Sequence, residues 1–257
     1  MICSHGITDI GCAREKNEDR ILIDESLGLY IVADGMGGRS HGELAADLAI
    51  TTIQHYVGSS RDRLDVTWPF GYNFELSVGA NRLATAIQLA NRQVWKQAEN
   101  SPEYGGMGTT VAAVLADGAG LTIGNVGDSR VYAWRGALEQ ISVDDTWLKA
   151  MSGRGPTQVD MSKHPLKNFL TQAAGSKDLV DVHIAEVELR ENDIIVLSSD
   201  GLHGLVSDAE IAATIASVPS ILEAGAKLVQ LAKAAGGPDN ISVILLKLAP
   251  LDDAITV

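Results

Sequence analysis

Two aspartates stand at the ends of long apolar runs, and each is followed directly by glycine. Asp34 closes the run "LYIVADG", and Asp200 closes the run "IIVLSSDG". Such a run predicts a buried strand, and the fixed end of a buried strand can hold a carboxylate at the mouth of a cleft. Three further aspartates fall in segments that read as loops: Asp19, Asp128 and Asp239.

Dispersed aspartates of this kind suit hard divalent cations, because Mg²⁺ and Mn²⁺ prefer oxygen ligands in octahedral geometry. A two-ion site holds its ions roughly 3.5–4 Å apart and needs a bridging carboxylate. The chain has no HExxH motif and no Cys/His cluster, which argues against zinc. Spacing alone leaves two interpretations open, a two-ion hydrolytic centre and ordinary turn aspartates. The third Asp-Gly pair, at Asp117, reads as a hairpin turn without function.

A second chemistry is suggested by the segment 38–42, which matches the pattern G-x-S-x-G with Ser40 at its centre. In hydrolases that pattern places the nucleophilic serine at the strand-to-helix turn itself. Here the apolar strand ends at Ala33, several residues earlier, and short patterns of this kind are common by chance. A serine hydrolase that uses Ser40 therefore stays the alternative to a metal-dependent enzyme.

Composition narrows the class of protein. The chain has 257 residues, 46% of them hydrophobic, and a formal net charge of −13. A packed core is expected, and nucleic-acid backbones would be repelled. Cys3 and Cys12 have no metal-type spacing and are expected to be reduced thiols. No signal peptide and no apolar run near 20 residues is visible, so we expect a cytoplasmic protein without a membrane segment.

Periodicity predicts the elements of the first half of the chain. Residues 20–35 read as a hairpin, and residues 42–57 and about 81–98 read as helices with apolar stripes. Between the helices, residues 58–79 show no clean period and read as a loop pinned by aromatic side chains. Four strands of a meander follow, at 109–116, 120–127, 130–136 and 137–142.

The second half begins with residues 150–176, which read as irregular and could form a mobile flap at about 150–170. A strand then ends at Asp200. Capping-box patterns at Ser207 and Ser220 start two helices, the second of which stops at a Gly-Gly-Pro sequence. A last strand covers 241–248. With no repeat and no linker, we expect one domain over residues 1–257.

A resemblance covers nearly the whole chain, from about residue 6 to 248. The motifs that carry it occur in order: "RxxNED" from Arg14, "ADGMGG" from Ala33, "GE" at Gly42, "GMGTT" from Gly106, "GDSR" from Gly127, "SDGL" from Ser199 and "GGPDNISVI" from Gly236. This pattern resembles the bacterial type 2C protein phosphatases of the metal-dependent PPM family. The resemblance implies an α+β fold, a four-layer α-β-β-α sandwich with two central, mostly antiparallel sheets. It also implies metal-dependent hydrolysis of phosphoserine and phosphothreonine in proteins.

The resemblance assigns roles by position. Asp34 would bridge two core Mn²⁺ or Mg²⁺ ions, and the carbonyl oxygen of Gly35 would bind one of them. Asp200 and Asp239 would bind the second ion, and Asp128 together with Asp200 would hold a looser third one. The remaining assignments are Glu18 and Asp19 as holders of waters on the ions, Asn240 as a support for the ligands, and Arg14 as the residue that binds the substrate phosphate.

The resemblance also implies a mechanism. A water between two cations loses its proton near neutral pH and attacks phosphorus, while Arg14 offsets charge on the phosphoryl oxygens. Many eukaryotic members place a histidine general acid where this chain has Met36. The acid is therefore unassigned, with a water on the metal or His41 as candidates.

Further departures and alternatives remain. Asp144-Asp145-Thr146 stands where the family often has Asp-His-Ser or Asp-His-Thr, and no role follows for Asp145. The expected partners are phosphorylated proteins and a cognate Ser/Thr kinase, and a monomer is the default. The aromatic residues of segment 66–74 could help to select substrates. A non-catalytic binding module of the same fold would be expected to have lost a metal-binding aspartate, and none is lost.

Overall fold

The computed structural model describes residues 2–37, 41–63, 66–118, 120–152, 164–166, 168–188 and 190–248. Within these ranges the strands form two antiparallel sheets. The first sheet has the order β1-β11-β10-β7-β8, with bounds Ile2–Asp9, Ile241–Leu248, Ile194–Ser198, Arg130–Trp134 and Leu138–Gln140. The second has the order β2-β3-β5-β6-β9, with bounds Asp19–Asp24, Leu29–Met36, Val111–Asp117, Gly120–Val126 and His183–Glu188, and β4 (Gly108–Thr109) pairs with β3.

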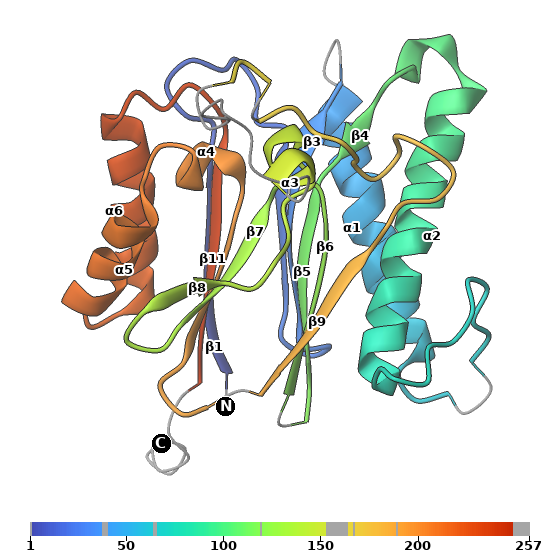
Figure 1. Ribbon diagram of the computed structural model, residues 1–257, viewed down its shortest axis with the longest axis horizontal. Coiled ribbons are helices and arrows are strands. Elements are labelled where there is room, and N and C mark those ends of the chain that lie inside the picture. The colour runs from blue at the N-terminus through green and yellow to red at the C-terminus, as the bar shows by residue number, and fades with distance from the viewer. Residues whose placement is uncertain are drawn as a thin grey trace.

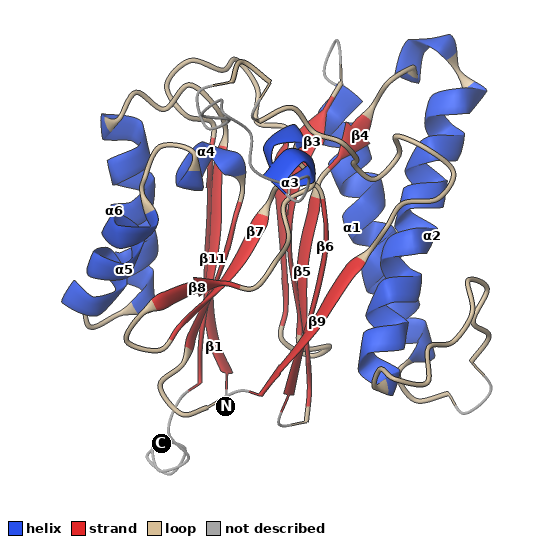
Figure 2. Ribbon diagram, viewed as in Figure 1, coloured by secondary structure: helices blue, strands red, loops and turns tan. Residues whose placement is uncertain are grey.

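Helices cover the outer face of each sheet, so the molecule has four layers (Figures 1 and 2). Long helices α1 (His41–Ser60) and α2 (Val78–Asn100) pack on the second sheet. The first sheet carries α4 (Asp200–His203), α5 (Asp208–Ser217) and α6 (Ile221–Ala234). The short elements η2 (Pro102–Tyr104) and α3 (Trp147–Ser152) lie in connections. The α-β-β-α sandwich expected from the resemblance is confirmed.

The central strands are apolar on both faces because each face meets a different layer. In β3, Leu29, Ile31 and Ala33 pack toward the helices, whereas Tyr30 and Val32 pack against the opposite sheet. A strand covered on both sides reads as a continuous apolar run rather than as an alternating one. The run that precedes Asp34 is therefore explained by its position in the middle of the sandwich.

The helix ends follow local sequence signals. The Ser77 hydroxyl accepts a hydrogen bond from the Ala80 N–H and caps α2. Ser207 and Glu210 form a reciprocal capping box at the start of α5, as predicted. The hairpin predicted at the third Asp-Gly pair is confirmed, because Asp117 pairs with Gly120 across the turn.

Several predicted bounds are wrong. The loop predicted over 58–79 is shorter, since α1 continues to Ser60 and α2 already begins at Val78. Strands β1 and β9 and helix α4 were not predicted at all. Both missed strands lie at sheet edges and are only half-buried, so their hydrophobic pattern is weak. Most of the expected flap, including residues 153–163, falls outside the described residues.

No helix in the described part of the chain is long and apolar enough to cross a membrane. Both cysteines, Cys3 and Cys12, are free thiols at exposed positions. This agrees with the expectation of two unpaired cysteines. The fold is therefore held together without disulfide bonds.

Candidate metal centre

A cavity of about 260 Å³ opens where β3 and β10 end at the same edge of the sandwich. It contains nearly every site residue that the sequence predicted. The lining includes Arg14, Glu18, Asp34, Gly35, Met36, Asp128, Asp200, Asp239 and Asn240. Asp19 does not line the cavity and lies buried behind it. Side chains from five separate parts of the chain therefore face one small volume.

Strand register brings Asp34 and Asp19 together. The two residues are directly opposite each other in the antiparallel β2–β3 pair. Side chains alternate along a strand, so Asp34 lies on the same face as Tyr30 and Val32, the face that meets the other sheet. Like charges placed directly opposite each other repel, and this pair is stable only if a proton or a cation intervenes.

Asp200 approaches from the other sheet. It follows β10 and opens the short helix α4, and its backbone turns so tightly against β11 that a Cβ on Gly201 would lie 1.9 Å from the Asn240 carbonyl oxygen. The neighbouring Ser199 hydroxyl donates to Asp19 Oδ2 over 2.7 Å, which joins the two sheets across the site. Asp200 Oδ1 is buried and has no hydrogen-bond partner.

The carboxylates shift one another's titration. Burial, and then the charges of Asp19 and Asp200, raise the pKa of Asp34 well above its usual value. Burial raises the pKa of Asp19 to about 6, and that of Asp128 to about 7, with Asp200 contributing in both cases. Burial, and then the charge of Asp239, raise the pKa of Asp200. The cluster therefore has more negative charge than its surroundings neutralise.

Arg14 pairs with Asp239 at the rim of the cavity. Its Nη2 donates to Asp239 Oδ2 over 2.7 Å, and this hydrogen bond raises the pKa of the guanidinium. The other oxygen, Oδ1, accepts from the backbone N–H of Asn240. About half of the Arg14 side chain is exposed, so its remaining donors can reach a ligand at the mouth of the cavity.

Asn240 fastens the loop that carries Arg14 and Glu18. Its amide donates to the carbonyl oxygens of Ile10 and Lys16, and its Oδ1 accepts from the Glu18 N–H. Glu18 also lines the cavity, and its Oε1 atom is buried and has no hydrogen-bond partner. Asn240 therefore holds the backbone of residues 10–18 at the edge of the cavity.

Gly35 is required by close backbone packing. A Cβ at this position would lie 2.1 Å from the carbonyl oxygen of Gly42 and 2.7 Å from that of Glu18. The first turn of α1 therefore rests directly on the end of β3. This packing explains why glycine follows Asp34, and it fixes the backbone next to the central carboxylate.

The donor set fits divalent cations. Five carboxylates and a backbone segment face one cavity, two buried carboxylate oxygens have no partner, and several pKa values are raised, first by burial and then by mutual repulsion. Oxygen donors of this kind suit Mn²⁺ or Mg²⁺. Within the described ranges, however, no three acidic, His or Cys side chains converge closely enough to enclose an ion, and Asp239 is turned to Arg14. Ion binding therefore requires side-chain rotation.

Asp145, for which no role was predicted from the sequence, connects the site to its surroundings. Asp145 Oδ2 accepts from the Gly127 N–H and from Gln172 Nε2, both over 2.8 Å. Asp145 Oδ1 lies 2.8 Å from His183 Nε2. The Asp145 carboxylate thus connects the turn before Asp128, strand β9 and the segment that follows Leu170, a residue of the cavity wall. Only the tertiary structure could reveal this connection.

Histidines do not line the cavity in the part of the chain that the structure describes. His41, one candidate acid, packs edge-on against Tyr104 with ring centroids 5.1 Å apart. His203 is buried beside Ser198, and burial lowers its pKa to about 3, so it remains neutral. Ser40, the alternative nucleophile, lies outside the described residues. Asn168 and Leu170 complete the lining and carried no sequence signal.

Comparison with known proteins places this arrangement in a family. The family model described as protein phosphatase 2C matches residues 13–234. The serine/threonine protein phosphatase PstP of Mycobacterium tuberculosis is 33% identical over 247 residues, which cover 95% of this chain and 45% of that protein. The serine/threonine phosphatase stp of Listeria welshimeri is 31% identical, with 93% of both chains covered.

A solved structure agrees with the sequence relatives. The catalytic domain of the serine/threonine protein phosphatase PstP in complex with two manganese ions has a TM-score of 0.79 and 31% sequence identity. The match covers 97% of this chain and 99% of that one. The chain spans less than half the length of the mycobacterial PstP protein and nearly the full length of the Listeria one.

Proposed function

The chain belongs to the protein phosphatase 2C family, and we propose that it is a metal-dependent protein serine/threonine phosphatase. Its substrates would be phosphoserine and phosphothreonine residues in proteins, and its cofactors two Mn²⁺ or Mg²⁺ ions with a third held more loosely. The observation that carries this proposal is the convergence of Asp34, Asp128, Asp200 and Asp239 on one cavity, with Arg14 at its rim.

We propose Asp34 as the carboxylate between the two core ions. Its backbone supports this, because its carbonyl oxygen accepts from Thr110 N–H and Thr109 Oγ1, and its N–H donates to Thr110 Oγ1. Both the N–H and the carbonyl group of Asp34 are thereby held by hydrogen bonds to residues 109–110. Gly35, by its carbonyl oxygen, and the carboxylates of Asp200 and Asp239 would complete the two core positions.

Asp128 and Asp200 would hold the third ion, and Glu18 and buried Asp19 would hold waters on the ions. When bound, the ions supply the positive charge that lowers the pKa of water and stabilises charge on phosphorus. Each unpartnered carboxylate oxygen would then gain the cation that its surroundings lack. The same ions would remove the repulsion that raises the pKa values of the cluster.

Arg14 would bind the substrate phosphate. Its planar guanidinium can donate two parallel hydrogen bonds to phosphate oxygens, and half of the side chain is already exposed at the cavity mouth. Turning from Asp239 to a phosphate would also release that carboxylate for an ion. Substrate binding and ion binding would therefore support each other.

We also propose a kinase counterpart, a cellular location, a domain organisation and an oligomeric state. A protein phosphatase acts on products of a kinase, so we propose a cognate Ser/Thr kinase as the functional counterpart. A cytoplasmic location is proposed from the two free thiols, which suit a reducing compartment. The single domain over 1–257 and the monomeric state are also predictions. Light scattering during gel filtration tests the latter, and a single cooperative unfolding transition tests the former.

The deciding experiment measures hydrolysis of p-nitrophenyl phosphate with and without Mn²⁺. We compare the wild type with Asp34→Asn, and we check folding by circular dichroism. Asp117→Asn is the matched control, because it also alters an Asp-Gly pair at a strand end but lies in an exposed hairpin. The proposal requires Mn²⁺-dependent activity that is lost in Asp34→Asn and kept in Asp117→Asn.

The other outcomes favour the alternatives. No activity in folded, Mn²⁺-loaded wild type would indicate a non-catalytic binding module of the same fold. Activity that needs no metal and survives in Asp34→Asn would exclude the carboxylate cluster as the active site. Labelling of Ser40 by a serine-directed covalent probe would then be the next measurement.

A further inference from the structure

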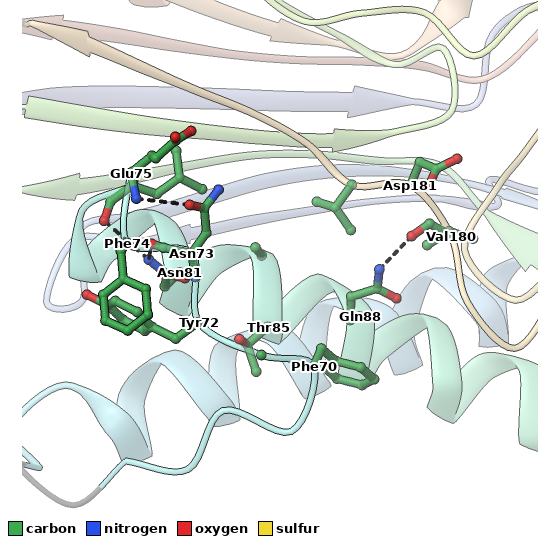
Figure 3. A pocket seen from close by; sticks show the side chains of 14 residues that line it. Phe70, Tyr72, Asn73, Phe74, Glu75, Asn81, Thr85, Gln88, Val180 and Asp181 are labelled. Carbon is green, nitrogen blue, oxygen red and sulfur yellow. Dashed lines mark hydrogen bonds between the residues drawn. The ribbon is translucent and has the colours of Figure 1, made fainter.

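A second and larger cavity lies on the outer, helix-covered side of the second sheet, against the first half of α2. It has a volume of about 780 Å³ and is bounded by residues 70–76, by α2 and by residues 180–182 (Figure 3). We call it the aromatic groove. It shares no lining residue with the candidate metal centre, so it can bind a ligand without blocking catalysis.

One wall of the aromatic groove contains the rings of Phe70, Tyr72 and Phe74, and Trp68 packs on Tyr72 from outside the lining. Trp68 and Tyr72 meet edge to face with centroids 5.2 Å apart, and Tyr72 and Phe74 do so at 5.1 Å. Phe74 leaves 91% of its surface exposed, which is unusual for a large apolar side chain. The Phe74 ring therefore presents an apolar surface that the other described residues leave almost entirely uncovered.

The wall is fixed in place by one asparagine. The Asn81 side chain on α2 accepts from the Asn73 N–H and donates to the Asn73 carbonyl oxygen (Figure 3). The same amide also donates to the carbonyl oxygens of Leu76 and Ser77. The loop is therefore preorganised, and a ligand would not have to bear the entropy cost of ordering it.

The polar groups that remain free in the aromatic groove are mostly acceptors. The amide groups of Asn81 and Gln88 already donate to backbone carbonyl oxygens, the latter to Val180. Gln88 Oε1 is buried without a hydrogen-bond partner, and Glu75 and Asp181 present exposed carboxylates. The described lining contains no Lys, Arg or His. A complementary ligand must bring positive charge and hydrogen-bond donors.

One lining ring, Phe70, already contacts a guanidinium from a residue outside the lining. The Arg92 side chain lies 5.3 Å from the centroid of the Phe70 ring, in cation–π geometry. Aromatic faces and carboxylates together favour arginine and lysine side chains, whose apolar stems pack on rings while their charged ends reach acceptors. Both kinds of group are present in the aromatic groove.

We propose that the aromatic groove docks an extended, lysine- or arginine-bearing segment of the phosphoprotein substrates. The proposal rests on the proposed phosphatase function and adds substrate selection remote from the phosphate itself. It predicts that basic phosphoproteins are preferred over acidic ones. It also assigns the substrate-selecting part of segment 66–74 to a defined surface.

Direct binding is measured first, by fluorescence anisotropy with a fluorescein-labelled peptide of alternating arginine and leucine. The test variant is Glu75→Gln/Asp181→Asn. The control, Glu139→Gln/Glu223→Gln, removes the same charge from exposed positions on β8 and α6. We expect the test variant to bind about three- to tenfold more weakly than the control. Equal affinities would refute the groove as the binding surface.

Turnover is measured next, on phosphorylated myelin basic protein, phosphorylated casein and p-nitrophenyl phosphate. The test variant should lose about three- to tenfold in kcat/KM on the basic phosphoprotein through a higher KM, and should match the control on the other two substrates. An equal loss on all three, or none on the basic protein, would overturn the proposal. A wild type inactive on p-nitrophenyl phosphate would instead refute the phosphatase function, and the binding measurement would still decide on the groove.

Discussion

Replacing Asp128 by asparagine should stabilise the metal-free protein, although it removes a proposed metal ligand. The side chain of Asp128 is largely buried, with the residue 9% exposed, and lines the cavity. Its pKa is raised from 3.8 to about 7, first by burial and then by the charges of Asp200 and Asp144. Asparagine has nearly the same shape and no charge, so it removes the repulsion and keeps the packing.

The sign follows from linkage. Because the pKa of Asp128 is higher in the folded state, the folded protein binds this proton more tightly than the unfolded chain does. The stability that the proton contributes is present below about pH 4 and is lost as the pH rises to about 7. Relative to a neutral side chain, the Asp128 carboxyl group therefore lowers the unfolding free energy of the wild type by about 2 kcal/mol at pH 5.5 and by about 4 kcal/mol at pH 8.5.

The assay is urea unfolding followed by far-ultraviolet circular dichroism, in EDTA, between pH 5.5 and 8.5. Asp128→Asn should exceed the wild type in unfolding free energy by an amount that grows with pH up to about pH 7. Asp62→Asn, an exposed position after α1, serves as control and should show no such growth. Added Mn²⁺ should narrow the difference, because the ion stabilises the folded wild type by binding its carboxylate.

A difference that is constant across the pH range would refute the reasoning, because the raised pKa is then not the source of instability. A less stable variant at pH 8.5 would refute it as well. In that case Asp128 would be held by favourable contacts that outweigh the repulsion of Asp200.

Three further predictions concern the positioning of the site. Asp145→Ala should lower the unfolding free energy by about 3 kcal/mol, because it leaves the Gly127 N–H without its acceptor and takes one of two acceptors from the Gln172 amide; urea unfolding measures this, and an unchanged midpoint would contradict it. Gly201→Ala should cost about 1–3 kcal/mol, whereas Gly58→Ala, inside α1 with its nearest contact at 3.5 Å, should be neutral or stabilising. Arg14→Lys should raise the KM for p-nitrophenyl phosphate about tenfold, because an ammonium cannot form the paired hydrogen bonds; steady-state kinetics would contradict this if KM stayed constant.

The core of the fold was predictable, whereas two of the four edge strands, β1 and β9, were not. Strands β3, β5, β6, β10 and β11 lie in the middle of the sandwich and carry continuous apolar runs that the sequence displays openly. Strands β1 and β9 are half-exposed, so they form largely because a neighbouring strand supplies hydrogen-bond partners. These two edge strands are specified by their partners more than by their own residues, so a reading of local pattern misses them.

The candidate site shows the same division. Residue types and strand ends identified the aspartates, and the motif resemblance assembled them into one site. Asp145 escaped both approaches, because its importance depends on Gly127, Gln172 and His183, which meet only in the folded chain. The pairing of Arg14 with Asp239 likewise joins residues that are 225 positions apart.

Residue types and their neighbours along the chain indicated which side chains could hold a metal and which apolar strands end beside them. These properties are local, since they depend on residue type and on neighbours along the chain. Only the tertiary structure shows that Asp19 and Asp34 face each other, that Asp200 reaches them from the first sheet, and that a separate groove lies beside α2. The physical reason is that register and sheet packing bring distant residues together, and the cost of confining their charges arises only where they meet.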